Sequence, residues 1–272
     1  MKTLVTHINP HLDDIAAIWL FKKFNPEFQR IKVEFLKAGV EGVTWQGEGV
    51  DSDPEIIHFG IGKGKYDEHK GDVDDCATSL VWKDQKSSSS EHIETLALER
   101  LVEWVRLEDT GRLSVGEYDE FSVPAFIRSR DNNEESSRKS IELGSEILDR
   151  ILKVLKRTES SKIDWEGKEE FETNLGKFVA IKSDTVDREF CKRKKGDLFL
   201  IFNVNNHYVQ FFTPSHSLDL EPVYRKVKEL DSQASWFLHH SHHMVICGSA
   251  SAPDSNPTKL SYQELIDVVK GL

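Results

Sequence analysis

Cysteine is scarce in this sequence. Only three cysteines occur among 272 residues, and Cys76, Cys191 and Cys247 lie far apart along the chain. Because no CxxC pair is present, the spacing argues against both a zinc ribbon and a disulfide framework. We expect three small core residues in a protein from a reducing compartment.

Long apolar runs are missing as well. No stretch is long and apolar enough to cross a membrane, and carboxylates interrupt the first apolar segment too early for a secretory signal. We therefore expect a cytoplasmic protein without membrane contact. A length of 272 residues leaves room for one large domain or two ordinary ones.

Positive charge is in short supply. The chain has 36 Lys and Arg against 47 Asp and Glu, a formal net charge of −11. This balance argues against a protein that coats duplex DNA, because such binding depends on neutralising phosphates. It does not exclude an enzyme that acts on phosphate esters, because a bound metal ion supplies positive charge locally.

The first half of the sequence predicts an α/β sheet with crossover helices. Short buried strands are expected over residues 2–8, 31–39 and 54–62. Helices are expected from Asp13 or Asp14 to about Phe24, and over residues 76–85, 93–109 and 134–157.

The polar stretch 157–167 is the expected boundary between residues 1–157 and a smaller domain, residues 164–272. Beyond it, β-strands are expected within 177–184, 197–204 and 207–214, and a helix over 220–231. A closing helix is expected after Ser261, because Glu264 completes a capping box with it.

Histidines and carboxylates crowd together where the first strand should end. His7, His11, Asp13 and Asp14 fall within eight positions. Loops that leave the carboxyl ends of parallel strands meet in one crevice, where these side chains can converge on a cation. Imidazole suits Zn, Mn, Fe or Ni, and carboxylate suits Mg and Mn. The alternative is a capped helix with a hydrogen-bonded histidine.

Two later segments carry similar residue types. His58 is expected at a strand end, and the triplet Asp67-Glu68-His69 follows it. Asp109 ends a predicted helix, where the helix dipole disfavours a carboxylate unless a cation lies nearby. An ordinary surface loop and a glycine-capped helix end are the alternatives.

A histidine-rich segment lies near the carboxyl end. Imidazoles and main-chain N–H groups there can contact a phosphate, and a polar β-turn is the alternative. The residues in question are His239, His240, His242, His243, Gly248 and Ser249.

In this order, the four segments resemble the motifs of the DHH phosphoesterase superfamily. That superfamily includes RecJ exonucleases, manganese-dependent inorganic pyrophosphatases, and hydrolases of oligoribonucleotides and cyclic dinucleotides. The first motif matches the run from His7 to Asp13, the signature matches Asp67-Glu68-His69, and the fourth matches Asp109-Thr110-Gly111. Within the superfamily, the chain is most similar to the melanocyte-proliferating-gene exonuclease family, through Thr6-His7, His11-Leu12-Asp13-Asp14 and Tyr66-Asp67.

The resemblance implies a parallel-sheet catalytic domain, with a smaller α/β domain that closes over the cleft. It implies a phosphodiesterase that uses metal-activated water on nucleic acid ends or short oligonucleotides, in the manner of a 3′–5′ exonuclease. The metal would be Mn, with Zn, Fe or Ni as alternatives. The implied ligands are His7, His11, Asp13, His58, Asp67, Glu68 and Asp109.

The resemblance also implies that His69 and Asp67 are catalytic, and that His69 binds substrate together with the histidine-rich segment. His11, His58 and Glu68 depart from the superfamily pattern, which gives the site more imidazole and less negative charge. Two other functions therefore stay open: hydrolysis of a small nucleotide or pyrophosphate, and a catalytically degenerate nucleotide-binding or metal-binding module. The expected partners are a nucleotide or the ends of single-stranded RNA or DNA. A homodimer is one option for the oligomeric state.

Overall fold

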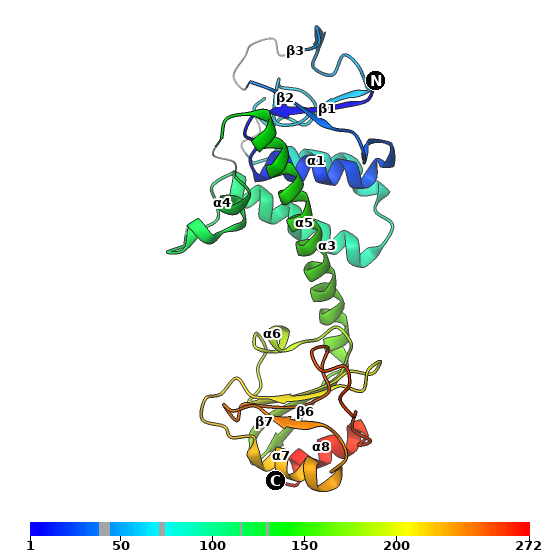
Figure 1. Ribbon diagram of the computed structural model, residues 1–272, viewed down its shortest axis with the longest axis vertical. Coiled ribbons are helices and arrows are strands. Elements are labelled where there is room, and N and C mark those ends of the chain that lie inside the picture. The colour runs from blue at the N-terminus through cyan, green and yellow to red at the C-terminus, as the bar shows by residue number, and fades with distance from the viewer. Residues whose placement is uncertain (38–43, 71–73, 115, 129–130) are drawn as a thin grey trace. The chain divides into compact units, whose positions relative to one another are not determined.

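The computed structural model describes residues 1–37, 44–70, 74–114, 116–128 and 131–272. Contacts within the chain divide it into two compact units, Met1–Lys156 and Arg157–Leu272 (Figure 1). Each unit combines helices with a sheet around its own hydrophobic core. The expected mixed α/β fold class is confirmed.

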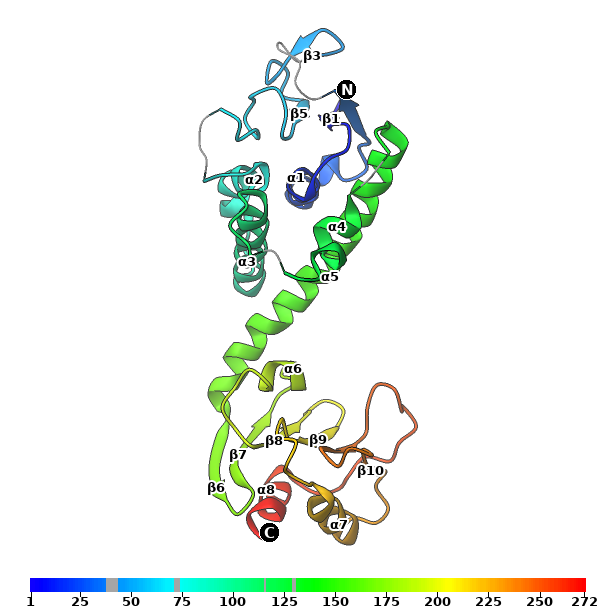
Figure 2. The ribbon, with the colours of Figure 1, turned by 90° about the vertical axis from the view of Figure 1, so that its left-hand side faces the viewer.

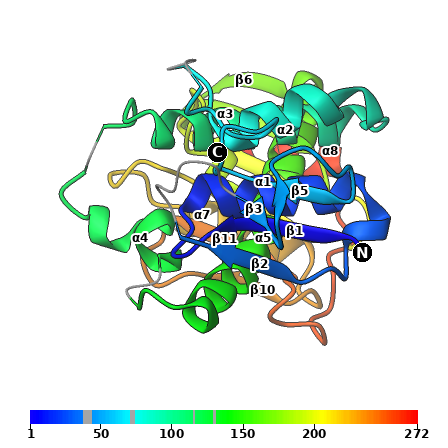
Figure 3. The same ribbon diagram turned by 90° about the horizontal axis from the view of Figure 1, so that it is seen from above.

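The first unit is built on a three-stranded parallel sheet. Strand β1 (Thr3–His7) lies between β2 (Val33–Leu36) and β5 (Ile56–His58), and both neighbours run parallel to it (Figure 3). The parallel sheet expected for the first half of the chain is confirmed. Because all three strands run the same way, the loops after β1 and β5 leave from one edge of the sheet. A short antiparallel hairpin, β3 (Thr44–Trp45) and β4 (Glu48–Gly49), precedes β5.

Helix α1 (Leu12–Phe24) packs on this sheet and is buried over its first ten residues. It begins at Leu12 with His11 as the N-cap, so the expected cap at Asp13 or Asp14 is wrong. The Asp14 carboxylate accepts the His11 main-chain N–H at 2.8 Å, which satisfies a donor that the helix itself cannot pair. Both aspartates thus lie inside the first turn.

Other helices cover α1 on two sides, with α2 on one side and α5 on the other (Figure 2). The apolar stripe of α3 is buried in the same core. The remaining elements of this unit are α2 (Ala77–Gln85), α3 (His92–Asp109), α4 (Val123–Ile127), the first part of α5 (Glu134–Asp164), and the 3-10 turns η1 (Pro26–Phe28), η2 (Lys86–Ser88) and η3 (Asp119–Phe121).

Helix α5 is longer than the sequence indicates. The expected helix over 134–157 continues to Asp164, so most of the polar stretch 157–167 is helical and not a linker. That stretch contains no proline, and its only glycine is Gly167 in the turn η4 (Trp165–Gly167). Lys162 pairs with Glu159 one turn away at 2.7 Å, which adds local support. A polar composition alone therefore does not end a helix.

The second unit is a six-stranded mixed sheet in the order β10-β11-β9-β8-β7-β6. Only the β7–β8 pair is parallel. Helices α7 and α8 bury one face of this sheet, and Trp165 with Cys191 covers part of the other. Its elements are β6 (Glu169–Thr173), β7 (Gly176–Lys182), α6 (Arg188–Cys191), β8 (Leu198–Phe202), β9 (Val209–Phe212), α7 (Glu221–Leu230), β10 (Trp236–Leu238), β11 (Met244–Cys247) and α8 (Tyr262–Lys270).

Several local predictions are confirmed in this part of the chain. The Ser261 hydroxyl accepts the Glu264 main-chain N–H, and the Glu264 carboxylate accepts from Ser261 in return, as in a capping box. All three cysteines are free and buried. Strand β6 was not expected, because its sequence EEFET is largely charged. Within the described residues, every helix falls short of the length and apolar character that a membrane span requires.

Candidate functional site

Asp13 is held against the amino end of α2. Its two carboxylate oxygens accept the main-chain N–H groups of Ala77 and Thr78, each at 2.8 Å. Thr78 also donates its hydroxyl to the Asp13 carbonyl oxygen at 2.8 Å. Only 3% of Asp13 is exposed. Burial and the nearby charge of Asp14 outweigh these hydrogen bonds and raise the pKa of Asp13 to about 7.

Three carboxylates from separate elements converge at this point. Asp13 in α1, Glu68 in the loop after β5 and Asp109 at the end of α3 each place one oxygen within 4.8 Å of the others. Burial raises the pKa of Glu68. Loss of hydration in the surrounding protein, together with the charges of Asp13 and Asp14, raises the pKa of Asp109 to about 7. Burial is the main cause of these shifts, and the like charges of neighbouring carboxylates add to it.

This carboxylate cluster, Asp13, Glu68 and Asp109, has the chemistry of a divalent cation site. Hard cations such as Mg²⁺ and Mn²⁺ take oxygen ligands. Glu68 Oε2 is buried and has no hydrogen-bond partner among the described residues. Each Asp13 oxygen keeps a second lone pair after accepting from α2. A double positive charge at this point would favour the ionised carboxylates and oppose the effects of burial and of repulsion, which raise the pKa values.

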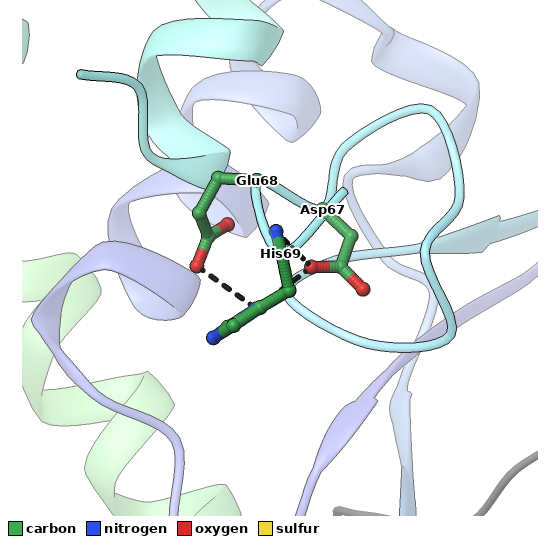
Figure 4. Close-up of side chains that lie close together, drawn as sticks. All are labelled: Asp67, Glu68 and His69. Atoms are coloured by element: carbon green, nitrogen blue, oxygen red, sulfur yellow. Dashed lines mark hydrogen bonds and ion pairs between the residues drawn. The ribbon is translucent and has the colours of Figure 1, made fainter. Parts of the chain in front are cut away.

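Asp67 and His69 lie beside the cluster and share Glu68 with it (Figure 4). His69 Nδ1 lies 2.8 Å from Asp67 Oδ1 and 3.2 Å from Glu68 Oε1. Asp67 is buried, whereas the His69 side chain is largely exposed. The hydrogen bond to Asp67 is the main cause of a raised pKa for His69. The arrangement therefore presents a proton-bearing imidazole next to the acidic cluster.

His7 is tied to Asp14 instead of pointing freely into the cluster. Its Nε2 lies 3.0 Å from Asp14 Oδ2, and its Nδ1 lies 2.9 Å from the Ile8 carbonyl oxygen. Burial lowers the pKa of His7, but the hydrogen bond and charge of Asp14 overcome this and raise it to about 9. As a metal ligand, His7 would have to lose its Nε2 proton and exchange Asp14 for the cation. Its ligand role stays a prediction.

His11 and His58 have different surroundings. The His11 ring lies 5.6 Å from the His7 ring, and burial is the main cause of a lowered pKa for His11, which favours its neutral form. His58 is 2% exposed, and both of its ring nitrogens are without partners among the described residues. Phe59 packs against α1, and strand alternation points the His58 side chain to the opposite face. The charged residue that acts on the pKa of His58 is Asp51. The structure does not bring His58 together with the carboxylate cluster.

Gly60, which the sequence did not assign to the site, supports it together with Asp14. Gly60 has a φ of 59°, and a Cβ at this position would lie 1.9 Å from Asp14 Oδ1. The absent side chain is what leaves room for the Asp14 carboxylate beside β5. The signals available in the sequence were the second aspartate of Asp13-Asp14 and the glycine directly after a buried strand. Neither signal indicates that the two residues meet.

The predicted substrate residues of the histidine-rich segment lie in the second unit. His242 Nδ1 lies 3.0 Å from Asp219 Oδ1, and His239 Nδ1 lies 2.8 Å from Ser241 Oγ. The rings of His239 and His240 lie 4.0 Å apart. The remaining members are His243, whose ring contacts His216, Gly248, which packs closely against Tyr208, and Ser249, which bridges to Ala252. Their substrate role stays a prediction.

Comparison with known proteins adds little to this geometry. No protein-family model matches the chain, and no curated protein matches it. Among solved structures, a pGpG-specific phosphodiesterase, PggH from Vibrio cholerae, is similar over 98% of both chains, with 13% identity and a TM-score of 0.33. At this TM-score the similarity carries no weight for fold or function. Both rest on the residues of the chain itself.

Proposed function

We propose that the chain is a metal-dependent phosphodiesterase that hydrolyses short oligonucleotides or nucleic acid ends. The carboxylate cluster carries this proposal, because Asp13, Glu68 and Asp109 come from three elements and place their oxygens within 4.8 Å. The acid–imidazole pair of Asp67 and His69 beside it supplies a second ingredient of phosphodiester hydrolysis. The resemblance of the motifs to DHH phosphoesterases favours Mn as the cation and water as the nucleophile.

The carboxylate cluster would hold the cation, with His11 as a neutral imidazole nearby. A divalent cation bound there supplies a water of lowered pKa and polarises the phosphate oxygens. Asp13 is oriented for this task because α2 fixes both of its oxygens. Glu68 brings an oxygen that no described donor satisfies.

His69 is the proposed general acid. Asp67 accepts a hydrogen bond from His69 Nδ1 and raises the pKa of the ring, which keeps the imidazole protonated nearer neutral pH. Nε2 then carries the second proton, which His69 would donate to the leaving oxygen of the ester. Asp67 serves as the residue that orients the ring.

Metal content and turnover of an Asp109→Asn variant test the proposal. The wild-type protein is expected to bind Mn near stoichiometry and to hydrolyse a 5′-phosphorylated diadenylate. The variant should lose at least about tenfold in metal affinity, because a charged ligand is removed. Glu99→Gln, at a half-buried position of the same helix where Glu99 pairs with Lys86, should behave like wild type.

Two outcomes would contradict the proposed function. A wild-type protein that stays metal-free in excess Mn has no cation site at the cluster. A protein that takes up Mn at the cluster without turnover is a binding module and not an enzyme.

A further inference from the structure

Residues 116–128, here called the aromatic arm, follow Asp109 in the chain and contain η3 and α4. The arm projects sideways from α1 (Figures 1 and 3). Three of its rings face solvent: Tyr118 is 68% exposed, Phe121 75% and Phe126 71%. The rings of Tyr118 and Phe121 lie 6.4 Å apart. Exposed rings clustered within nine positions indicate a surface that binds something.

The carboxyl end of the arm is anchored in the core beside the first turn of α1. Ile127 is 2% exposed and belongs to the same core as α1. Both Ile127 and Ile15 lie over Gly144 of α5, where a Cβ would be 2.7 Å from Ile15 and 3.6 Å from Ile127. Ile15 directly follows Asp14 in the first turn of α1. Arg128, the next residue after Ile127, therefore leaves the core beside the amino end of α1.

The positive charge of Arg128 also affects the pKa values of residues at the site. Its positive charge is one cause of the lowered pKa of His11, after burial and His7. It also opposes the rise that burial causes in the pKa of Glu108, the neighbour of Asp109. Arg128 is exposed, so its guanidinium is accessible to a ligand that approaches the cluster.

The charge of the arm limits the length of a ligand. Glu117, Asp119 and Glu120 alternate with the exposed rings and repel a long phosphate backbone. The faces of aromatic rings, by contrast, stack on nucleobases without regard to sequence. A guanidinium binds phosphate oxygens through charge-assisted hydrogen bonds. The combination fits a ligand of a few nucleotides with one phosphate held near Arg128.

We propose that the aromatic arm is a substrate-binding element of the first unit: Arg128 binds a phosphate of a short oligonucleotide, and Tyr118, Phe121 and Phe126 stack on its bases. This inference rests on the proposed function for the identity of the ligand. It adds a second substrate-binding element to the first unit, where the sequence assigned this role to His69 alone.

Calorimetric titration of 5′-phosphorylated diadenylate into the metal-free protein tests the arm without any turnover. Arg128→Gln should raise the Kd about tenfold, because one charge-assisted contact is lost, and Arg128→Lys should give an intermediate value. Arg150→Gln, an exposed arginine paired with Glu146 on α5, is the matched control and should leave the Kd unchanged.

The rings are tested with a Phe121→Ala/Phe126→Ala variant. This variant should weaken binding at least about fivefold, whereas Leu143→Ala on α5 should not. A decaadenylate should bind no more tightly than the diadenylate, since the acidic arm repels the extra phosphates. Circular dichroism checks that each variant retains its fold.

Each other outcome has a definite meaning. Equal Kd values for Arg128→Gln and Arg150→Gln, or no binding by wild type, would overturn the assignment of the arm. If the ring variant changes only the sedimentation coefficient, the arm is a contact between copies of the chain and the inference is wrong. Turnover with Mn that is insensitive to Arg128→Gln overturns the arm but leaves the proposed function. If the metal-loaded protein binds the diadenylate in an Arg128-dependent way but shows no turnover, the proposed function is overturned and the assignment of the arm is kept.

Discussion

His7 Nε2 lies 3.0 Å from Asp14 Oδ2, and this contact joins the end of β1 to the first turn of α1. The same Asp14 carboxylate accepts the His11 main-chain N–H and fills the space that Gly60 leaves open. One side chain thus joins the loop after β1, the start of α1 and the loop after β5.

The His7–Asp14 contact makes stability depend on pH above neutrality. Because the folded-state pKa of His7 is raised from 6.5 to about 9, its contribution is complete below pH 6.5 and is lost as the pH rises through 9. Urea unfolding of the metal-free protein should therefore show a free energy of unfolding that falls between pH 6.5 and 9. His7→Gln should flatten this part of the profile. A profile identical to wild type would mean that His7 is not protonated in the folded state.

Asp13 also makes stability fall as the pH rises, but over a lower pH range than His7. Its carboxyl pKa is raised from 3.8 to about 7, so the metal-free folded state binds more protons than the unfolded state between these values. Its unfavourable ionisation lowers stability as the pH rises from about 4 to 7. Mn should reverse this trend, because protons and cation compete for the same oxygens. Melting temperatures with and without Mn should differ more at pH 8 than at pH 5, and an equal difference would contradict the assignment.

Gly60→Ala should damage both stability and the site. The new methyl group would lie on Asp14 Oδ1, at a backbone φ that favours glycine. We expect a loss of about 2 kcal/mol or more in the free energy of unfolding, and weaker Mn binding. Gly167→Ala is the control, since nothing lies within 4 Å of its Cβ position. Urea unfolding and Mn titration of the two variants make the comparison, and equal values for both would count against the role of Gly60.

The proposed acid catalyst has a pH signature. His69→Gln should lower kcat by about 100-fold or more, the range typical of a lost general acid. Asp67→Asn removes the bond that raises the pKa of His69, so the loss of activity at high pH should begin at a lower pH than in wild type. His92→Gln, at the exposed start of α3, should leave the profile unchanged. A pH profile of kcat that does not move in Asp67→Asn would contradict the pairing.

Much of the fold could be predicted because its signals are local. The short apolar runs bounded by glycine and proline became β1 and β5, and the periodic stretches became α2 and α3. The Ser261–Glu264 capping box needs only residues three apart. The 4–24 segment was likewise recognisable as a strand, a turn and a helix. Such signals act within one turn or one strand, so one sequence suffices to read them.

Other features depended on contacts between distant residues. The sequence showed His58 at a strand end, but its place on one face of the sheet follows from the pairing of β5 with β1. Helix α5 continues through the polar stretch and ends only at the turn Trp165–Gly167. The aromatic arm carries no motif, and its position follows from Ile127 packing beside Ile15.

The sequence by itself determined which residues of this protein have the chemistry to hold a cation: Asp13, Glu68 and Asp109 all stood out by type and by place. Tertiary structure decided that these three meet, that Asp14 pairs with His7, and that His58 lies elsewhere. The physical reason is that residue type sets what a side chain can bind, whereas Glu68 and Asp109, which are 41 positions apart in the chain, are brought together only by the packing of α1, α2 and α3.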